Sequence, residues 1–130
     1  MLQVTSDGPS HNLTAQCLWA GPDLLVLVTA GDAPHLGAVA AATPRPSLAD
    51  PARTSATASV LTYLGHKEDA LAKELAEHLA ARLGVKVVVA AGAHWDGLDQ
   101  AGIAQVGQNS RRLGQLILEH CGAQNSEESA

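Results

Sequence analysis

Three of the six histidines of this 130-residue chain lie in loops that directly follow predicted β-strands. A rigid sheet holds the loops at its strand ends in place, so such loops often carry functional groups. If the strands end at the same edge, we expect these histidines to share one pocket. They are His35 after residues 24–29, His66 after residues 55–63 and His94 after residues 85–90. The others, His11, His78 and His120, are expected at the surface.

Three histidines and a water can form a catalytic zinc site, and nearby aspartates could add oxygen ligands. The chain, however, has no HxH or HxxxH pair to place two ligands on one element. The candidate aspartates are Asp32, Asp69 and Asp96. Nucleophilic catalysis is less favoured, because GxSxG is absent and no recognised motif pairs Cys17 or Cys121 with a base. We expect both cysteines to be buried thiols.

An anion site is better motivated at Gly65-His66-Lys67, which precedes the first turn of a predicted helix. Free backbone N–H groups there attract phosphate or carboxylate, and the lysine adds positive charge. Glu68 and Asp69 already complement the helix dipole, so a structural explanation stays open. The phosphate-binding patterns GxxxxGK[ST] and GxGxxG are absent.

The elements that position these residues follow from hydrophobic periodicity. Strands are expected in five segments: residues 11–20, 24–29, 37–43, 55–63 and 85–90. A helix opens at residues 65–69, with leucines every four residues, and Gly84 ends it. The order β-β-β-β-α-β-α predicts an α+β fold, an antiparallel meander of four strands followed by one β-α-β crossover.

A second helix is predicted from about Leu98 to His120, capped by Gly122. Its inward residues are expected to be Ile103, Val106, Leu113, Leu116 and Ile117. We therefore expect a single domain over residues 1–122 and a disordered tail over residues 123–130. The first ten residues form a loose lead-in or a short edge strand, and Pro44–Arg53 a flexible loop of unassigned role.

The composition restricts the function classes. The net charge is −5 with no basic face, which argues against nucleic-acid binding. The longest apolar run, residues 24–30, is too short to span a membrane, and no signal peptide is evident, so a cytoplasmic protein is expected. The apolar residues are mostly Ala, Val and Leu with no Phe, which predicts a thin core and hints at an oligomer.

Three segments together resemble the LpdD-like family of prenylated flavin chaperones, small partners of UbiD-type (de)carboxylases. They are residues 23–40 with DAPHLG, residues 59–69 with GHKED, and residues 87–96 with AGAHWD. The resemblance implies a fold similar to proteasome-assembly-chaperone domains and a homodimer. It also implies a protein that binds prenylated FMN, or FMN, and delivers it to an apo-decarboxylase.

By this resemblance three walls form the cofactor site: Gly31, Asp32, His35 and Gly37; Gly65, His66 and Lys67; and His94 with Asp96. Charge places Lys67 and the 65–67 backbone toward phosphate, and hydrogen bonding places His35 and His94 toward the ring. Trp95 departs from the family pattern and could stack on a flavin or pack in a dimer. Gly97-Leu98-Asp99 replaces an asparagine-containing helix start, which predicts a weaker cap.

Two alternatives stand beside the chaperone hypothesis: a protein-interaction subunit without cofactor, and a histidine-based, metal-dependent enzyme. The scarcity of aromatic residues argues against a deep flavin pocket within one monomer. A pocket shared across a dimer would remove that objection. No catalytic constellation is evident, so we expect binding and not turnover.

Overall fold

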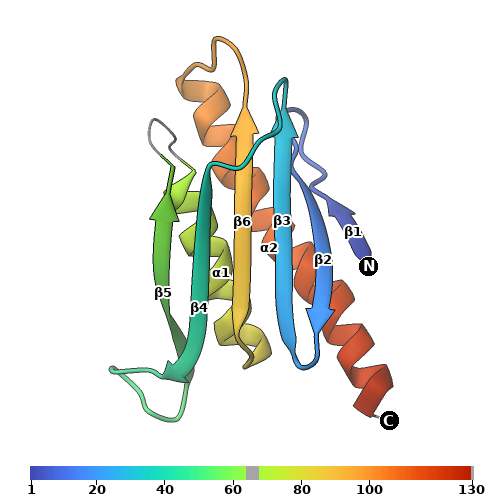
Figure 1. The fold of residues 1–130 in the computed structure, drawn as a ribbon, viewed down its shortest axis with the longest axis vertical. Coiled ribbons are helices and arrows are strands. Elements are labelled where there is room, and N and C mark those ends of the chain that lie inside the picture. Colours follow the sequence, from blue (N-terminus) through green and yellow to red (C-terminus); the bar gives the residue numbers. More distant parts are fainter. Residues whose placement is uncertain (64–67, 130) are drawn as a thin grey trace.

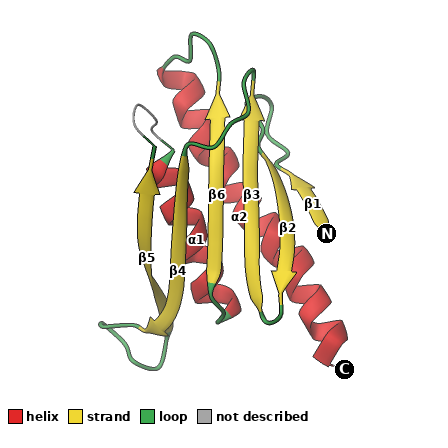
Figure 2. Ribbon diagram, viewed as in Figure 1, coloured by secondary structure: helices red, strands yellow, loops and turns green. Residues whose placement is uncertain are grey.

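The computed structural model describes residues 1–63 and 68–129. Six strands form one sheet, and two helices pack on one of its faces (Figure 1). The other face carries no helix of the described chain (Figure 2). The elements are β1 Leu2–Thr5, β2 Thr14–Ala20, β3 Asp23–Gly31, β4 Ala38–Pro46, β5 Thr54–Thr62, α1 Asp69–Leu83, β6 Val87–His94 and α2 Gln100–Ser129. This architecture confirms the predicted α+β class.

The strand order is β1-β2-β3-β6-β4-β5, which corrects the prediction in two ways. There are six strands in the described chain, because Leu2–Thr5 pairs with β2 as an edge strand. The hairpins β2–β3 and β4–β5 form as expected, but the four-strand meander is wrong. Strand β6 lies between β3 and β4, parallel to the first and antiparallel to the second. Its apolar run gains a pairing partner on both edges there.

The predicted loop Pro44–Arg53 is shorter than expected. Strand β4 continues to Pro46, and β5 begins at Thr54. Strand β6 pairs with β4 only as far as Ala42, so the end of β4 has one neighbour. A proline lacks the N–H that a second neighbour would require, and it is therefore tolerated at such an edge.

Helix α1 follows the predicted leucine periodicity. Its buried residues include Leu75 and Leu79, with alanines beside them that bring the helix close to β4, β5 and β6. Gly84 ends the helix in the left-handed conformation (φ +67°), and its N–H donates to the carbonyl of Ala80. The predicted glycine cap is confirmed.

Helix α2 differs from the prediction at its start and its end. The Asp99 carboxylate accepts a 2.7 Å hydrogen bond from the N–H of Gly102, so the cap predicted to be weak is formed. The helix also continues past Gly122, its predicted cap, to Ser129. A glycine inside a helix costs only about 1 kcal/mol and does not by itself stop it. The domain boundary at residue 122 stays a prediction.

The buried stripe of α2 follows the predicted one except at its start. Leu113 and Ile117 are fully buried as expected, but Ile103 is 59% exposed. Buried Gly102 and Asn109 occupy that part of the stripe instead. A 3.6-residue period back from Leu113 passes through residues 109, 106 and 102 and leaves residue 103 outside. The described residues contain no helix long and apolar enough to cross a membrane.

The core lies between the sheet and the two helices and consists mainly of Val, Ala and Leu side chains. Both cysteines belong to it as free, buried thiols, as predicted. The alternate side chains of the strands form what we call the uncovered face, the side of the sheet without helices. Its central aliphatic residues are Leu18, Leu25, Leu27, Val39, Ala41, Leu61, Val88 and Ala90.

Candidate functional site

The strands that precede the three histidine loops all end at one edge of the sheet. Strand β3 is parallel to β6, and β4 is antiparallel to both β6 and β5, so β3, β5 and β6 run the same way (Figure 1). The strands before His35, His66 and His94 therefore end at the same edge, which was the condition for these histidines to share one pocket. The carboxyl ends of parallel strands are a common place for ligands in open sheets. We call this edge, with the loops that follow Gly31, Thr62 and His94, the histidine edge.

The loop from β3 to β4 must cross the end of β6, because β6 lies between them (Figure 1). It crosses at buried Gly92, where a Cβ would overlap the carbonyl oxygen of His35. After the crossing, the N–H of Gly37 donates to the carbonyl of Ala91 at 2.9 Å. Gly92 was not among the predicted site residues, although a glycine inside a strand can signal close backbone approach.

His35 is held at the crossing by both ring nitrogens. Its Nδ1 lies 2.9 Å from the carbonyl oxygen of Ala33, and its Nε2 lies 2.9 Å from Oε1 of Glu68. Both contacts hold the imidazole ring beside the start of α1. The same Glu68 oxygen accepts from the N–H of Ala93 at 3.4 Å. One carboxylate thus joins the start of α1, the β3–β4 loop and β6.

Glu68 was expected only to complement the helix dipole. Its side chain is 11% exposed, and a Cβ at Gly37 would overlap its carboxylate. The glycine of DAPHLG therefore makes room for this carboxylate. The sequence signal was the acidic residue just before the helix, but its partner His35 lies 33 positions away.

A second histidine–carboxylate pair lies where β6 ends. Nε2 of His94 is 3.0 Å from Oδ1 of Asp96, and the N–H of Asp96 donates to Oδ2 of Asp32 at 3.1 Å. The N–H of Asp32 donates to the carbonyl of His94 at 2.7 Å. Gly31 makes this approach possible with φ +85°, because a Cβ there would overlap that carbonyl. His94 is 53% exposed, so a ligand can reach its ring.

Trp95 is half-buried and packs within the chain. Its ring meets the ring of His11 edge to face, with centroids 5.3 Å apart. His11, which was predicted at the surface, is half-buried in the structure and makes this contact. Asn109, which is 2% exposed, donates to the carbonyls of Ser10 (2.6 Å) and His11 (2.7 Å) and holds their loop against α2.

The predicted anion site falls outside the described residues, since Gly65, His66 and Lys67 belong to the undescribed segment. The segment they occupy joins β5 to α1, between described residues Tyr63 and Glu68. The N–H of Tyr63 donates to the carbonyl of Gly37 at 2.8 Å, which ties the residue after β5 to the β3–β4 loop. No group of three or more metal-ligating side chains suitable for an ion occurs among the residues that the structure describes.

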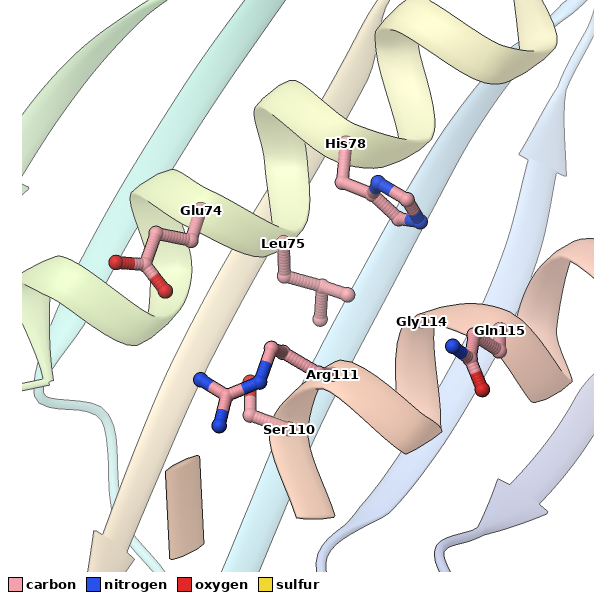
Figure 3. A pocket seen from close by; sticks show the side chains of 7 residues that line it. All are labelled: Glu74, Leu75, His78, Ser110, Arg111, Gly114 and Gln115. Carbon is pink, nitrogen blue, oxygen red and sulfur yellow. The ribbon is translucent and has the colours of Figure 1, made fainter. Parts of the chain in front are cut away.

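A hollow of about 300 Å³ lies elsewhere, between α1 and α2 (Figure 3). It is lined by Glu74, Leu75, His78, Ser110, Arg111, Gly114 and Gln115. His78 was predicted to be at the surface, but it is half-buried and its ring points into this hollow. Burial, and then the charge of Arg82, lower the pKa of His78 below its usual value. None of the predicted site residues lines the hollow.

Comparisons with known proteins agree with the resemblance noted in the sequence. A search of curated proteins finds no match to the chain. A scan against family models finds the prenylated flavin chaperone LpdD-like domain over residues 7–122 of the 130-residue chain. The match spans the histidine edge, both helix starts and the sheet from β2 onward. The chain therefore belongs to the prenylated flavin chaperone LpdD-like family.

Proposed function

We propose that this protein binds prenylated FMN, or FMN, at the histidine edge and delivers it to an apo-decarboxylase of the UbiD type. In this proposal it acts in the cytoplasm and catalyses no reaction of its own. Family membership supports flavin chaperoning. The observation that carries the site is that the ends of β3 and β6 and the start of α1 meet at one edge, joined by the His35–Glu68 pair and by the hydrogen bond from the N–H of Asp96 to Asp32.

The described residues suit the polar parts of a flavin. His94 and Asp96 are exposed and offer a donor and an acceptor for the heteroatoms of the ring. In the proposal His35 joins His94 on the ring, and the backbone at 65–67 with Lys67 binds the phosphate. Gly31, Asp32, Gly37 and Trp95 shape the walls. Both thiols are buried in the core, which argues for binding and against nucleophilic chemistry on the ligand.

Binding is tested by an anaerobic titration with FMN and with prenylated FMN, followed by absorbance and fluorescence. We expect saturable binding that weakens about tenfold or more in Lys67→Ala, the effect of losing one charge-assisted hydrogen bond. A similar loss is expected in His35→Ala, which removes the contact with Glu68 that joins the β3–β4 loop to the start of α1. His120→Ala, which changes an exposed histidine on α2, is the matched control. Failure of either flavin to bind would favour the interaction subunit without cofactor.

Delivery is a separate measurement. An apo-decarboxylase mixed with the loaded protein should gain cofactor absorbance faster than with the same concentration of free prenylated FMN. Binding without this acceleration would make the protein a flavin store and would refute the delivery step alone.

We further propose a homodimer in which the uncovered faces of two copies pack together. Leu25 of β3 and Leu18 of β2 are register partners on this face and are 42% and 51% exposed, and Leu61 is 63% exposed. In the described chain the ionisable side chains of this face, such as Asp23, Lys86 and His94, lie at the strand ends and leave its centre uncharged. An aliphatic, uncharged sheet face is complementary to a second copy of itself.

The area of the face is sufficient for such a dimer. Five strands spaced about 4.8 Å apart, each with about seven residues rising about 3.3 Å, present roughly 500 Å² of flat area per copy. Two copies would bury about 1,000 Å² before side-chain relief is added, which reaches the size of specific interfaces. A dimer would also supply apolar surface from two copies to a flavin ring, whereas one monomer has few aromatic residues to form a pocket for it.

Light scattering during size-exclusion chromatography tests the dimer. Leu25→Glu places a charge among the aliphatic residues of the face and should give a folded monomer. Leu48→Glu is the control, because Leu48 is 90% exposed in the loop between β4 and β5. A wild-type monomer, or a Leu25→Glu dimer as stable as the wild type, would exclude this interface.

A further inference from the structure

Strand β5 forms one outer edge of the sheet, and no strand of the described chain pairs with its far side (Figure 1). It spans nine residues, TSATASVLT, with no charged residue and no proline. Its register with β4 runs one residue to one residue, from Pro46 opposite Thr54 to Ala38 opposite Thr62, so no bulge bends this edge. Natural sheets protect their edges with short strands, charges, prolines or bulges. Edge strand β1 has only four residues, whereas β5 is long and has none of these protections.

The hydrogen bonds that flank β5 fix which of its backbone groups point outward. The N–H of Tyr63 donates to the carbonyl of Gly37, and the N–H of Ser47 donates to the carbonyl of Arg53, both at 2.8 Å. Because hydrogen-bonded and non-hydrogen-bonded pairs alternate in an antiparallel ladder, the odd-numbered residues of β5 face β4. The even-numbered residues turn their N–H and C=O groups to the open side: Thr54, Ala56, Ala58, Val60 and Thr62. An extended chain laid along β5 would meet a regular row of donors and acceptors.

A hollow of about 320 Å³ adjoins this edge on the helix side of the sheet. We call it the edge hollow; it is lined by Val60, Asp69, Ala70, Lys73 and Glu74. Its volume equals that of about ten water molecules in the liquid, which is enough for one long side chain. Directly opposite residues of neighbouring strands point to the same face of a sheet. The residue of an added strand that lies opposite Val60 would therefore point toward the edge hollow.

The charges around the edge hollow favour a cation. Neither Asp69 nor Glu74 makes an ion pair within the part of the chain that the structure describes. Lys73 is already paired with Glu77 at 3.4 Å, so it does not neutralise them. A lysine or arginine could lay its apolar stem along Val60 and bring its charge to the two carboxylates. A second copy of β5 could not supply this cation, because the strand contains no basic residue.

We propose that β5 is a docking edge for an extended segment of another protein, which adds one strand to the sheet and places a lysine or arginine in the edge hollow. In this kind of recognition the main-chain hydrogen bonds give affinity, and the pocket for a side chain gives specificity. The inference does not rest on flavin binding. Because β5 ends at the histidine edge, a partner docked along it would lie beside that edge.

The probe is the fluorescein-labelled peptide TVTKTVT, titrated with the full chain and followed by fluorescence anisotropy. We expect saturable binding, and we expect TVTETVT to bind about tenfold more weakly or worse, because its glutamate would face Asp69 and Glu74. Two further peptides carry an N-methyl group, one on the lysine and the other on the residue after it. Successive amides of a strand point to opposite sides, so one methyl group should block binding and the other should leave it intact.

Val60→Pro tests the edge from the protein side. It removes one N–H from the open side and leaves the hydrogen bonds to β4 in place, as proline is tolerated where its missing N–H would face solvent. Binding of TVTKTVT should fall about tenfold or more. Val60→Thr is the matched control, because it keeps the N–H and nearly the same shape, and it should change the affinity by no more than about twofold. Circular dichroism checks that both variants fold, and the N-methyl pair decides the question if Val60→Pro does not.

Glu74→Gln tests the edge hollow. The variant should bind TVTKTVT about fivefold more weakly, and the preference for the lysine peptide over the glutamate peptide should narrow. Glu119→Gln, which changes an exposed carboxylate on α2, should alter neither value.

Four results would overturn the proposal. They are no saturable binding of TVTKTVT, equal effects of the two N-methyl groups, equal affinity for the lysine and glutamate peptides, and a loss of self-association in Val60→Pro. The last result, seen by light scattering, would make β5 an interface between copies of this chain. Since none of these measurements contains a flavin, their failure would leave the proposed flavin binding untouched.

Discussion

Replacing Gly92 by alanine tests the crossing of the β3–β4 loop over β6. Gly92 has a backbone conformation that alanine also adopts, so the change adds one methyl group and no backbone strain. That methyl overlaps the backbone carbonyl of His35, which cannot rotate away as a side-chain end could. The loop must therefore move by about an ångström or more to restore van der Waals distance.

The cost follows from the contacts that hold the loop down. Movement weakens the Gly37 to Ala91 backbone hydrogen bond (2.9 Å) and the His35–Glu68 contact (2.9 Å). The backbone hydrogen bond contributes about 1 kcal/mol and the His35–Glu68 ion pair a similar amount, so we expect a loss of about 2 kcal/mol in the free energy of unfolding. With a urea dependence of about 1.5 kcal/mol per M, the midpoint should fall by roughly 1.3 M.

Urea unfolding followed by circular dichroism measures this change. Gly107→Ala is the matched control, because a Cβ there meets its nearest atom, Nη1 of Arg111, at an ordinary 3.7 Å. Inside α2 this control should gain up to about 1 kcal/mol of stability. A Gly92→Ala protein as stable as the wild type, with an unchanged amide-exchange rate at Gly37, would refute the close crossing and the site built on it.

Three further outcomes are expected. Asn109→Ala should cost about 2–3 kcal/mol of stability in urea unfolding, because it leaves the carbonyls of Ser10 and His11 without their donor; an unchanged midpoint would contradict this role. Asp99→Ala should lower the melting temperature by an amount equal to about 1 kcal/mol, the contribution of one helix cap, and Asp99→Asn should restore it. The lowered pKa of His78 means that the folded state resists protonation of this side chain. Its contribution to stability is therefore full above the unfolded pKa of about 6.5 and is lost as the pH falls below that value. His78→Gln should reduce the loss of stability between pH 7 and pH 5, and a pH profile identical to that of the wild type would contradict the assignment.

Local patterns were sufficient for most of the elements. The leucine period and Gly84 predicted α1, and the turn after Ala20 predicted the β2–β3 hairpin. The position of β6 was not predictable in this way, because strand order depends on pairing between distant segments. Only the start of the apolar stripe of α2 was misplaced, by one residue, since Ile103 is a better hydrophobic signal than the buried glycine beside it.

For the same reason, some residues of the candidate site could be predicted from local sequence and others could not. His35 and His94 were found because each follows an apolar strand in a glycine-containing loop. Glu68 and His11 were missed as site residues, because their roles come from contacts with residues far away in the sequence. In the structure Glu68 contacts His35 and His11 contacts Trp95, and both His35 and Trp95 were predicted site residues. Only the distances in the folded chain join these pairs.

The strand order that sequence patterns could not predict is also what creates the histidine edge. If β4 had followed β3 as its neighbour, a short turn would have joined them and DAPHLG would project into solvent. Because β6 occupies the place between them, the connection has to pass across the end of β6, close enough to exclude a side chain at Gly92. This passage brings His35 to Glu68 at the start of α1 and leaves His94 exposed beside it. The histidine edge is built from a backbone crossing and therefore depends on glycines and on strand order. The fold should consequently tolerate changes of exposed side chains at this edge better than an added methyl group at Gly92.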